Sequence, residues 1–168
     1  MIATKRHSAA APGRDQGRHS FYGNRKKFIV KKTIKIHAQP AEVWDALTNP
    51  VKTRQYFFNC EVHSSWKVGS PISWKGRIFF VKKIEFHGRI LQILPKRLLK
   101  YTLQNQGKKG QPPSTSTVTD ELSFSKGITT LSITDDVGQT EGAEERYIRS
   151  NKGWDKVLDG LKSVVEGT

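Results

Sequence analysis

The stretch EGAEERYIRSNKGWDKVLDGLKSVVEG, residues 141–167, decides the fold. At about 100° per residue its apolar side chains fall on one arc, which predicts a long amphipathic helix: Ala143, Tyr147, Trp154, Val157, Leu158, Leu161 and Val165. Glutamates in its first turns and Lys162 near its end suit the helix dipole, and Gly167 can end it. A helix with one apolar face must bury that face, so the rest of the chain has to provide a covering layer.

The chain before this helix reads mainly as strands. Between Phe28 and Ile36 apolar and polar residues alternate, with Lys32 as the one exception. The strand expected over 79–94 should bend or bulge at Gly88. The polar segment 104–116, which holds two prolines, should form an exposed loop. After the first strand, further strands are expected at 60–66, 72–74, 79–94, 99–103, 117–124 and 128–137.

Two short helices are expected after the first strand. Pro40 suits a first helical turn, Val43, Trp44 and Leu47 form an apolar stripe, and Asn49-Pro50 ends the helix before a second one over 51–56. The strands that follow are joined by short links, which implies an antiparallel sheet. The predicted fold class is α+β: a curved antiparallel sheet of about six to seven strands around the C-terminal helix.

Composition limits the domain organisation and the partners. The chain has 168 residues, enough for one domain, and we expect a disordered basic tail at 1–26 and a folded domain at 27–168. The net charge of +14 favours non-specific association with nucleic acid, mainly through the tail. The single cysteine and the absence of a long apolar run predict a cytoplasmic protein with no membrane span.

Five spaced segments carry a resemblance to known proteins: PAEVWDALTNP from Pro40, WKVGSPISWKG from Trp66, GRILQILPKRLLKYTL from Gly88, TVTDELS from Thr117 and GWDKVLDGLKSVVE from Gly153. They resemble the START-like (SRPBCC) helix-grip superfamily, and within it the subfamily named for the activator of the heat-shock protein 90 ATPase. The resemblance covers about Phe28 to Glu166 and concerns only the C-terminal type of domain of those activators.

The resemblance implies a cavity between the sheet and the C-terminal helix. Members of the superfamily bind lipids, hormones and polyketides, and some cyclise or hydrolyse their ligands. The expected function is therefore binding of a small apolar or amphipathic ligand. Two alternatives stay open: contact with a heat-shock chaperone in a stress response, and an enzymatic cyclase or hydrolase role. The eukaryotic activators carry a separate N-terminal domain, where this chain has only a short basic stretch.

Several residues are candidates to line such a cavity. Asp120 lies at period 2 between Val118 and Leu122, so it should face inward and either anchor a ligand or reach water at an edge or bulge. Ser150 and Asn151 fall on or beside the helix arc between Tyr147 and Trp154, as a partly hollow interior would show. The alternative is that Ser150 merely bonds its own helix backbone. The full candidate set is Trp74, Tyr101, Asp120, Tyr147, Ser150, Asn151 and Trp154.

No motif predicts catalysis, a metal site or a cofactor. The five histidines show no metal-ligand spacing, and His37, His63 and His87 fall on the outward phase of their strands. Cys60 lies on an inward phase, as a core residue would. The adjacent Asp135 and Asp136 should diverge, so they should form no catalytic pair.

Overall fold

The computed structural model describes residues 27–105, 110 and 113–168. The tail at 1–26 and positions 106–109 and 111–112 of the predicted loop lie outside the described residues. The elements are β1 Ile29–Ile36, α1 Pro40–Thr48, α2 Pro50–Tyr56, β2 Cys60–Ser64, β3 Pro71–Ile78, β4 Lys82–Leu94, β5 Leu98–Asn105, β6 Ser114–Ser125, β7 Ile128–Asp136 and α3 Ala143–Glu166.

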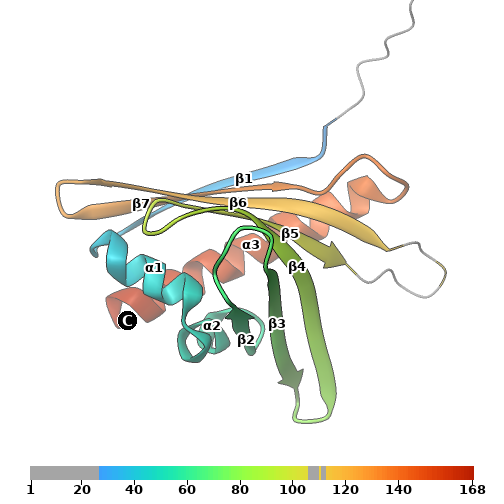
Figure 1. The fold of residues 1–168 in the computed structure, drawn as a ribbon, viewed down its shortest axis with the longest axis horizontal. Helices are drawn as coiled ribbons and strands as arrows, with labels where there is room; N and C mark the ends of the chain where they lie inside the picture. Colours follow the sequence, from blue (N-terminus) through green and yellow to red (C-terminus); the bar gives the residue numbers. More distant parts are fainter. Residues whose placement is uncertain (1–26, 106–109, 111–112) are drawn as a thin grey trace, which may run out of the picture.

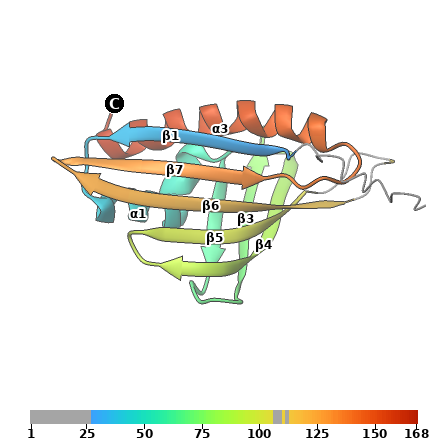
Figure 2. The same ribbon diagram turned by 90° about the horizontal axis from the view of Figure 1, so that it is seen from above.

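The strands form one antiparallel sheet in the order β1-β7-β6-β5-β4-β3-β2. The sheet is strongly bent: β1, β7 and β6 cross the top of the molecule in Figure 1, while β3 and β4 turn down beside α2. Helix α3 runs along β1 and β7, as the view from above shows (Figure 2). The described part of the chain therefore has seven strands and three helices in an α+β helix-grip arrangement, which confirms the predicted fold class.

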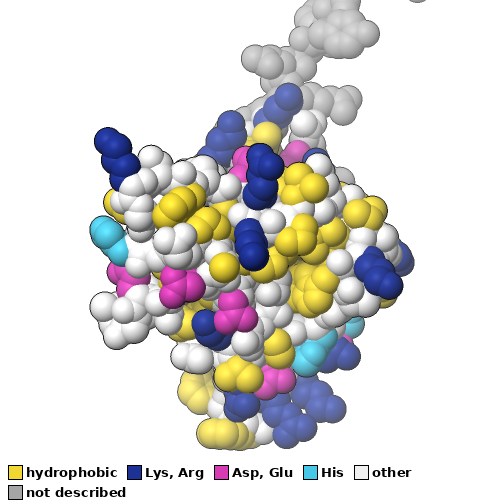
Figure 3. All heavy atoms as spheres, turned by 60° about the vertical axis from the view of Figure 1, so that its left-hand side comes forward, with side chains coloured by type: hydrophobic (Ala, Val, Ile, Leu, Met, Phe, Trp, Pro, Cys, Tyr) yellow, Lys and Arg dark blue, Asp and Glu magenta, His cyan; other side chains and the backbone are white. Residues whose placement is uncertain are grey.

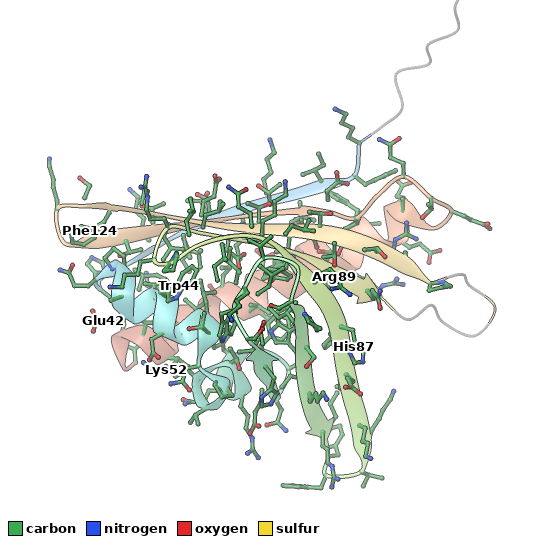
Figure 4. All side chains as sticks on the ribbon, in the orientation of Figure 1. Glu42, Trp44, Lys52, His87, Arg89 and Phe124 are labelled. Atoms are coloured by element: carbon green, nitrogen blue, oxygen red, sulfur yellow. The ribbon has the colours of Figure 1, made fainter. Side chains whose placement is uncertain are left out.

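Gly88 lies where the sheet turns. A Cβ atom at this position would be 1.6 Å from the carbonyl oxygen of Thr102 on β5, so only glycine allows the two strands to approach this closely. The register shift between β4 and β5 lies slightly further along, between Ile90 and Gln92. The predicted bend is thus present at Gly88, and the bulge follows it. His87 and Arg89, labelled in Figure 4, lie on the exposed face of β4.

The expected strand over 79–94 is wrong at its beginning. Residues 79–81 form the turn of the β3–β4 hairpin, and β4 starts only at Lys82. The run Ile78–Val81 is apolar and has no glycine, proline or asparagine, the residues that mark turns in a sequence. The pattern therefore favoured a continuous strand.

Local interactions hold the short helices and the first strand in place. In α1, Glu42, labelled in Figure 4, accepts a hydrogen bond from the backbone N–H of Gln39 at 2.8 Å. In α2 the Asn49 side chain accepts from Val51 N–H at 3.0 Å. Lys32, the exception in the alternation of β1, pairs with Asp155 of α3 at 2.7 Å. Its charge therefore has a partner on the helix that the sheet grips.

The apolar core lies between the sheet and the three helices. Val30 and Ile36 of β1, Ile90 of β4 and Leu131 of β7 are fully buried, and Trp154, Val157, Leu158 and Leu161 of α3 pack against this layer. Cys60 is buried, as predicted, and burial raises the pKa of its thiol to about 11. Within the described ranges, none of the helices is both long and apolar enough to cross a bilayer.

Candidate functional site

A cavity of about 250 Å³ lies between the sheet and the N-terminal half of α3. Its walls come from the segment after α2, from β4 to β7 and from α3. The apolar lining residues are Phe57, Phe58, Phe86, Leu103, Val137, Trp154 and Val157. The other lining residues are Ser116, Asp135, Arg146, Arg149, Ser150 and Gly153.

Phe57 is the centre of the aromatic wall. Its ring stacks on Trp74 with ring centres 5.6 Å apart and meets Trp154 edge-on at 6.4 Å. Trp74 in turn contacts Tyr101 at 5.1 Å. Trp74 and Tyr101 therefore form a layer behind Phe57 and support it, while Phe57 itself faces the cavity. Aromatic contacts of this geometry hold rings in fixed positions.

Asp135 supplies the buried polar centre of the α3 wall. Its side chain is 3% exposed, and its Oδ2 accepts hydrogen bonds from the Ser150 hydroxyl at 2.5 Å and from the Trp154 indole N–H at 3.0 Å. These bonds fix two of the α3 residues that line the cavity. Sequence reasoning missed Asp135 as a site residue, although it has the same period-2 phase as Leu131 and Ile133, and that phase was the available signal.

Asp120 is buried in the sheet next to this centre. It is 2% exposed, and its Oδ1 has no hydrogen-bond partner among the described residues. Burial, together with the negative charge of Asp135, raises the pKa of the Asp120 carboxyl to about 8. The strand pairing places Asp120 two positions from Asp135 on the same face. The prediction of an inward side chain is confirmed, and the alternative that it reaches water is wrong.

Two arginines border the cavity on α3. Arg146 donates hydrogen bonds to the backbone carbonyls of Val137, Thr140 and Glu141 and so ties the β7–α3 connection to the helix. Arg149 is half-exposed and reaches Glu145 only at 3.9 Å. Sequence reasoning did not select either arginine. Their positions depend on where α3 crosses the sheet, which helical periodicity alone does not give.

The predicted site residues differ in how they lie relative to the cavity. Ser150 and Trp154 line the cavity. Trp74 and Tyr101 support its aromatic wall, Asp120 lies beside Asp135, and Asn151 and Tyr147 are outside the lining. Tyr147 contacts Phe28 instead, with ring centres 6.1 Å apart. That any of these residues binds a ligand stays a prediction.

The two glycines inside α3 should respond oppositely to alanine. A Cβ atom at Gly153 would meet only Phe58 at 3.8 Å, whereas one at Gly160 would be 2.8 Å from the Cβ of Tyr56. We expect Gly153→Ala to stabilise the protein by about 1 kcal/mol through helix propensity. Gly160→Ala should destabilise it by roughly 1–3 kcal/mol through overpacking. Chemical denaturation of both variants checks this, and equal shifts of one sign would contradict the described packing.

Comparisons with known proteins place the chain in a family. The family model "Activator of Hsp90 ATPase homolog 1-like protein" matches residues 37–166. The solution structure of ChR145 from Cytophaga hutchinsonii is similar to this chain at 32% identity, with a TM-score of 0.65 over 83% of this chain and 94% of the other. A comparison with curated proteins gave no match.

Two further solved structures share the fold at lower identity. CalU16 from Micromonospora echinospora has 23% identity and a TM-score of 0.64, over 82% of this chain and 75% of the other. The Aha1 dimer from Colwellia psychrerythraea has 17% identity and a TM-score of 0.62, over 82% of this chain and 96% of the other. With its sheet, its gripped helix and a family match over residues 37–166, the chain belongs to the Activator of Hsp90 ATPase homolog 1-like family.

Proposed function

We propose that the protein binds a small amphipathic ligand in the cavity between the sheet and α3, with an anionic group of the ligand at Arg149. The observation that carries this proposal is the cavity itself, an aromatic pocket inside the domain with a cationic side chain at its border. Ligand sites are commonly concave and mainly apolar, with a few placed polar groups.

The size of the cavity limits the ligand. Its volume of about 250 Å³ is just below the usual range of small-molecule sites, roughly 300–1,000 Å³. A single medium-length alkyl chain or one ring system suits this volume better than a two-chain lipid. The wall of Phe57, Phe86 and Trp154 offers apolar contact for such a group.

The polar groups favour an anion at the border. The Oδ2 atom of Asp135 accepts from Ser150 and Trp154, whereas its Oδ1 atom is buried without a hydrogen-bond partner among the described residues. Arg146 is bonded to backbone carbonyls. Arg149, by contrast, is half-exposed and only weakly paired with Glu145, so its guanidinium is available to a carboxylate. The predicted site residues Ser150, Tyr101 and Asp120 would then act mainly by shaping and supporting the cavity rather than by holding the charged end, and Asn151 lies outside the lining.

Titration calorimetry with decanoate and with decanol tests the proposal. Wild type should bind decanoate more tightly than decanol. Gly153→Leu, which extends a side chain from α3 into the cavity, should weaken decanoate binding by roughly tenfold or more. Gly153→Ala is the matched control, because its Cβ atom makes only an ordinary contact with Phe58 and should leave binding nearly unchanged.

Arg149→Gln separates the charge from the cavity. It should remove the preference for decanoate over decanol while leaving decanol affinity unchanged. If Gly153→Leu binds both compounds as wild type does, the cavity is not the binding site. In that case the family description would favour a role in chaperone contact, to be measured as an effect on a chaperone's ATPase rate.

A further inference from the structure

The tip of the β3–β4 hairpin exposes three consecutive apolar side chains. Phe79 is 89% exposed, Phe80 91% and Val81 87%. The hairpin projects from the lower end of the molecule in Figure 1, and the space-filling view shows an apolar tip beside basic side chains (Figure 3). These three residues, called the hairpin tip below, therefore give up the stability that burial would provide.

The backbone of the hairpin tip adds a second cost. Phe79 and Phe80 have φ angles of +52° and +60°, and Val81 N–H donates to the Ile78 carbonyl at 3.2 Å to close the turn. Turns with two central residues of positive φ favour Asn-Gly, because asparagine and glycine adopt positive φ at a lower cost than other residues do. Two phenylalanines in this turn serve neither the turn nor the core. Residues that conflict with local structure in this way commonly mark a functional site.

The charges beside the hairpin tip are mainly basic. Between positions 75 and 85 lie Lys75, Arg77, Lys82 and Lys83, against the single carboxylate of Glu85. Lys75 pairs with Glu85 at 3.2 Å. Within residues 27–105, 110 and 113–168, no ion pair involves the other three basic side chains.

A hollow next to Phe80 brings the basic residues together. Four basic side chains line it with Phe80: Arg54, Lys75, Arg77 and Lys83. Two carboxylates line it as well, Glu61, which pairs with Arg54 at 3.4 Å, and Glu85, which pairs with Lys75, so the positive charges outnumber the negative ones. The hairpin tip thus combines a protruding apolar point with a cationic recess at its base. An anionic lipid headgroup has the charge that fits this recess, and the acyl region of the bilayer would take up the apolar side chains of the hairpin tip.

We propose that the hairpin tip inserts into the interface of an anionic lipid bilayer, with Arg77, Lys82 and Lys83 contacting the headgroups. A bilayer surface suits a convex point of three side chains, whereas a stable protein interface buries roughly 800 Å² on each partner and requires a broader complementary surface. Basic residues near an anionic leaflet add attraction, and exposed aromatic residues supply the apolar anchor. This inference is independent of the ligand cavity.

Vesicle sedimentation with the full chain tests the inference. The vesicles are phosphatidylcholine with phosphatidylserine at about two to one, and phosphatidylcholine alone as the neutral comparison. The decisive variant is Phe79→Asn/Phe80→Gly, which keeps every charge and installs the pair that the turn prefers. We expect it to melt at a higher temperature than wild type and to bind the anionic vesicles roughly tenfold or more weakly. Lys82→Gln/Lys83→Gln should weaken binding by about fivefold per lysine.

A labelled cysteine reports insertion directly. Cys60 is buried, so a cysteine introduced by Val81→Cys can be labelled selectively with an environment-sensitive fluorophore. Its emission should shift to the blue with anionic vesicles, while the same label at Ser125→Cys, at the exposed end of β6, should not shift. Three results would overturn the inference: no binding to anionic vesicles, unchanged binding by the Asn-Gly variant, or equal emission shifts at both labels.

Discussion

Asp120→Asn should remove most of the pH dependence of stability between about pH 4 and pH 8. The Asp120 carboxyl has a folded-state pKa of about 8 against an ordinary value of 3.8. As the pH rises from 4, the unfolded chain loses this proton first, so the folded state is destabilised by up to about 1.4 kcal/mol per pH unit. The stability contribution of the protonated group is thus complete below pH 4 and lost once the pH passes 8. Asparagine stays neutral at every pH and should give a flat profile.

Chemical denaturation at a series of pH values measures this effect. At pH 8 the variant should exceed wild type by several kcal/mol, and near pH 4 the two should differ little. Asp159→Asn is the control, because Asp159 is exposed on α3 and should leave the profile unchanged. A wild-type profile that rises from pH 4 to pH 8 would contradict the assignment of a neutral Asp120 beside Asp135.

Gly88→Ala should be the most damaging single substitution in the sheet. The added Cβ atom would lie 1.6 Å from the Thr102 carbonyl oxygen, and this neighbour is backbone, which cannot rotate away. Strands β4 and β5 would have to separate at the bend that curves the sheet around α3. We expect a loss of at least about 3–4 kcal/mol, a large share of the stability of a typical domain.

Thermal unfolding monitored by circular dichroism checks this prediction. Gly153→Ala serves as the comparison, because the same chemical change at that position has only an ordinary contact with Phe58. Equal melting temperatures for Gly88→Ala and wild type would mean that β4 and β5 do not approach each other as described.

The sequence predicted the fold because its main elements carry strong periodic signals. The arc from Ala143 to Val165 defined α3, and Pro40 and Asn49-Pro50 marked the limits of α1 and α2 closely. Alternation located most strands within a few residues. Lys32 breaks the alternation of β1 because it is a charged residue at a position of the inward phase. Its partner, Asp155, lies more than a hundred residues away in the sequence, so no local pattern could reveal that ion pair.

The site was predictable only in part. Inward phase on α3 indicated Ser150 and Trp154, which line the cavity. Phe57 and Arg149 were missed because their roles depend on how the segment after α2 and the helix meet across the sheet. The sequence analysis considered Asp135 only as a possible catalytic pair with Asp136. Its proximity to Asp120 depends on the pairing register of β6 and β7, which the sequence does not give. The turn at Phe79 and Phe80 had no turn signal, because its residues conflict with its backbone.

Nuclear Overhauser contacts between decanoate and the protein test the central claim most directly. Binding in the cavity should give contacts from the alkyl chain to the rings of Phe57 and Trp154 and to the methyl groups of Val157, and these contacts should be lost in Gly153→Leu. Contacts confined to Phe79 and Phe80, or no contacts at ligand concentrations that saturate the calorimetric signal, would contradict the claim that the cavity between the sheet and α3 is the binding site.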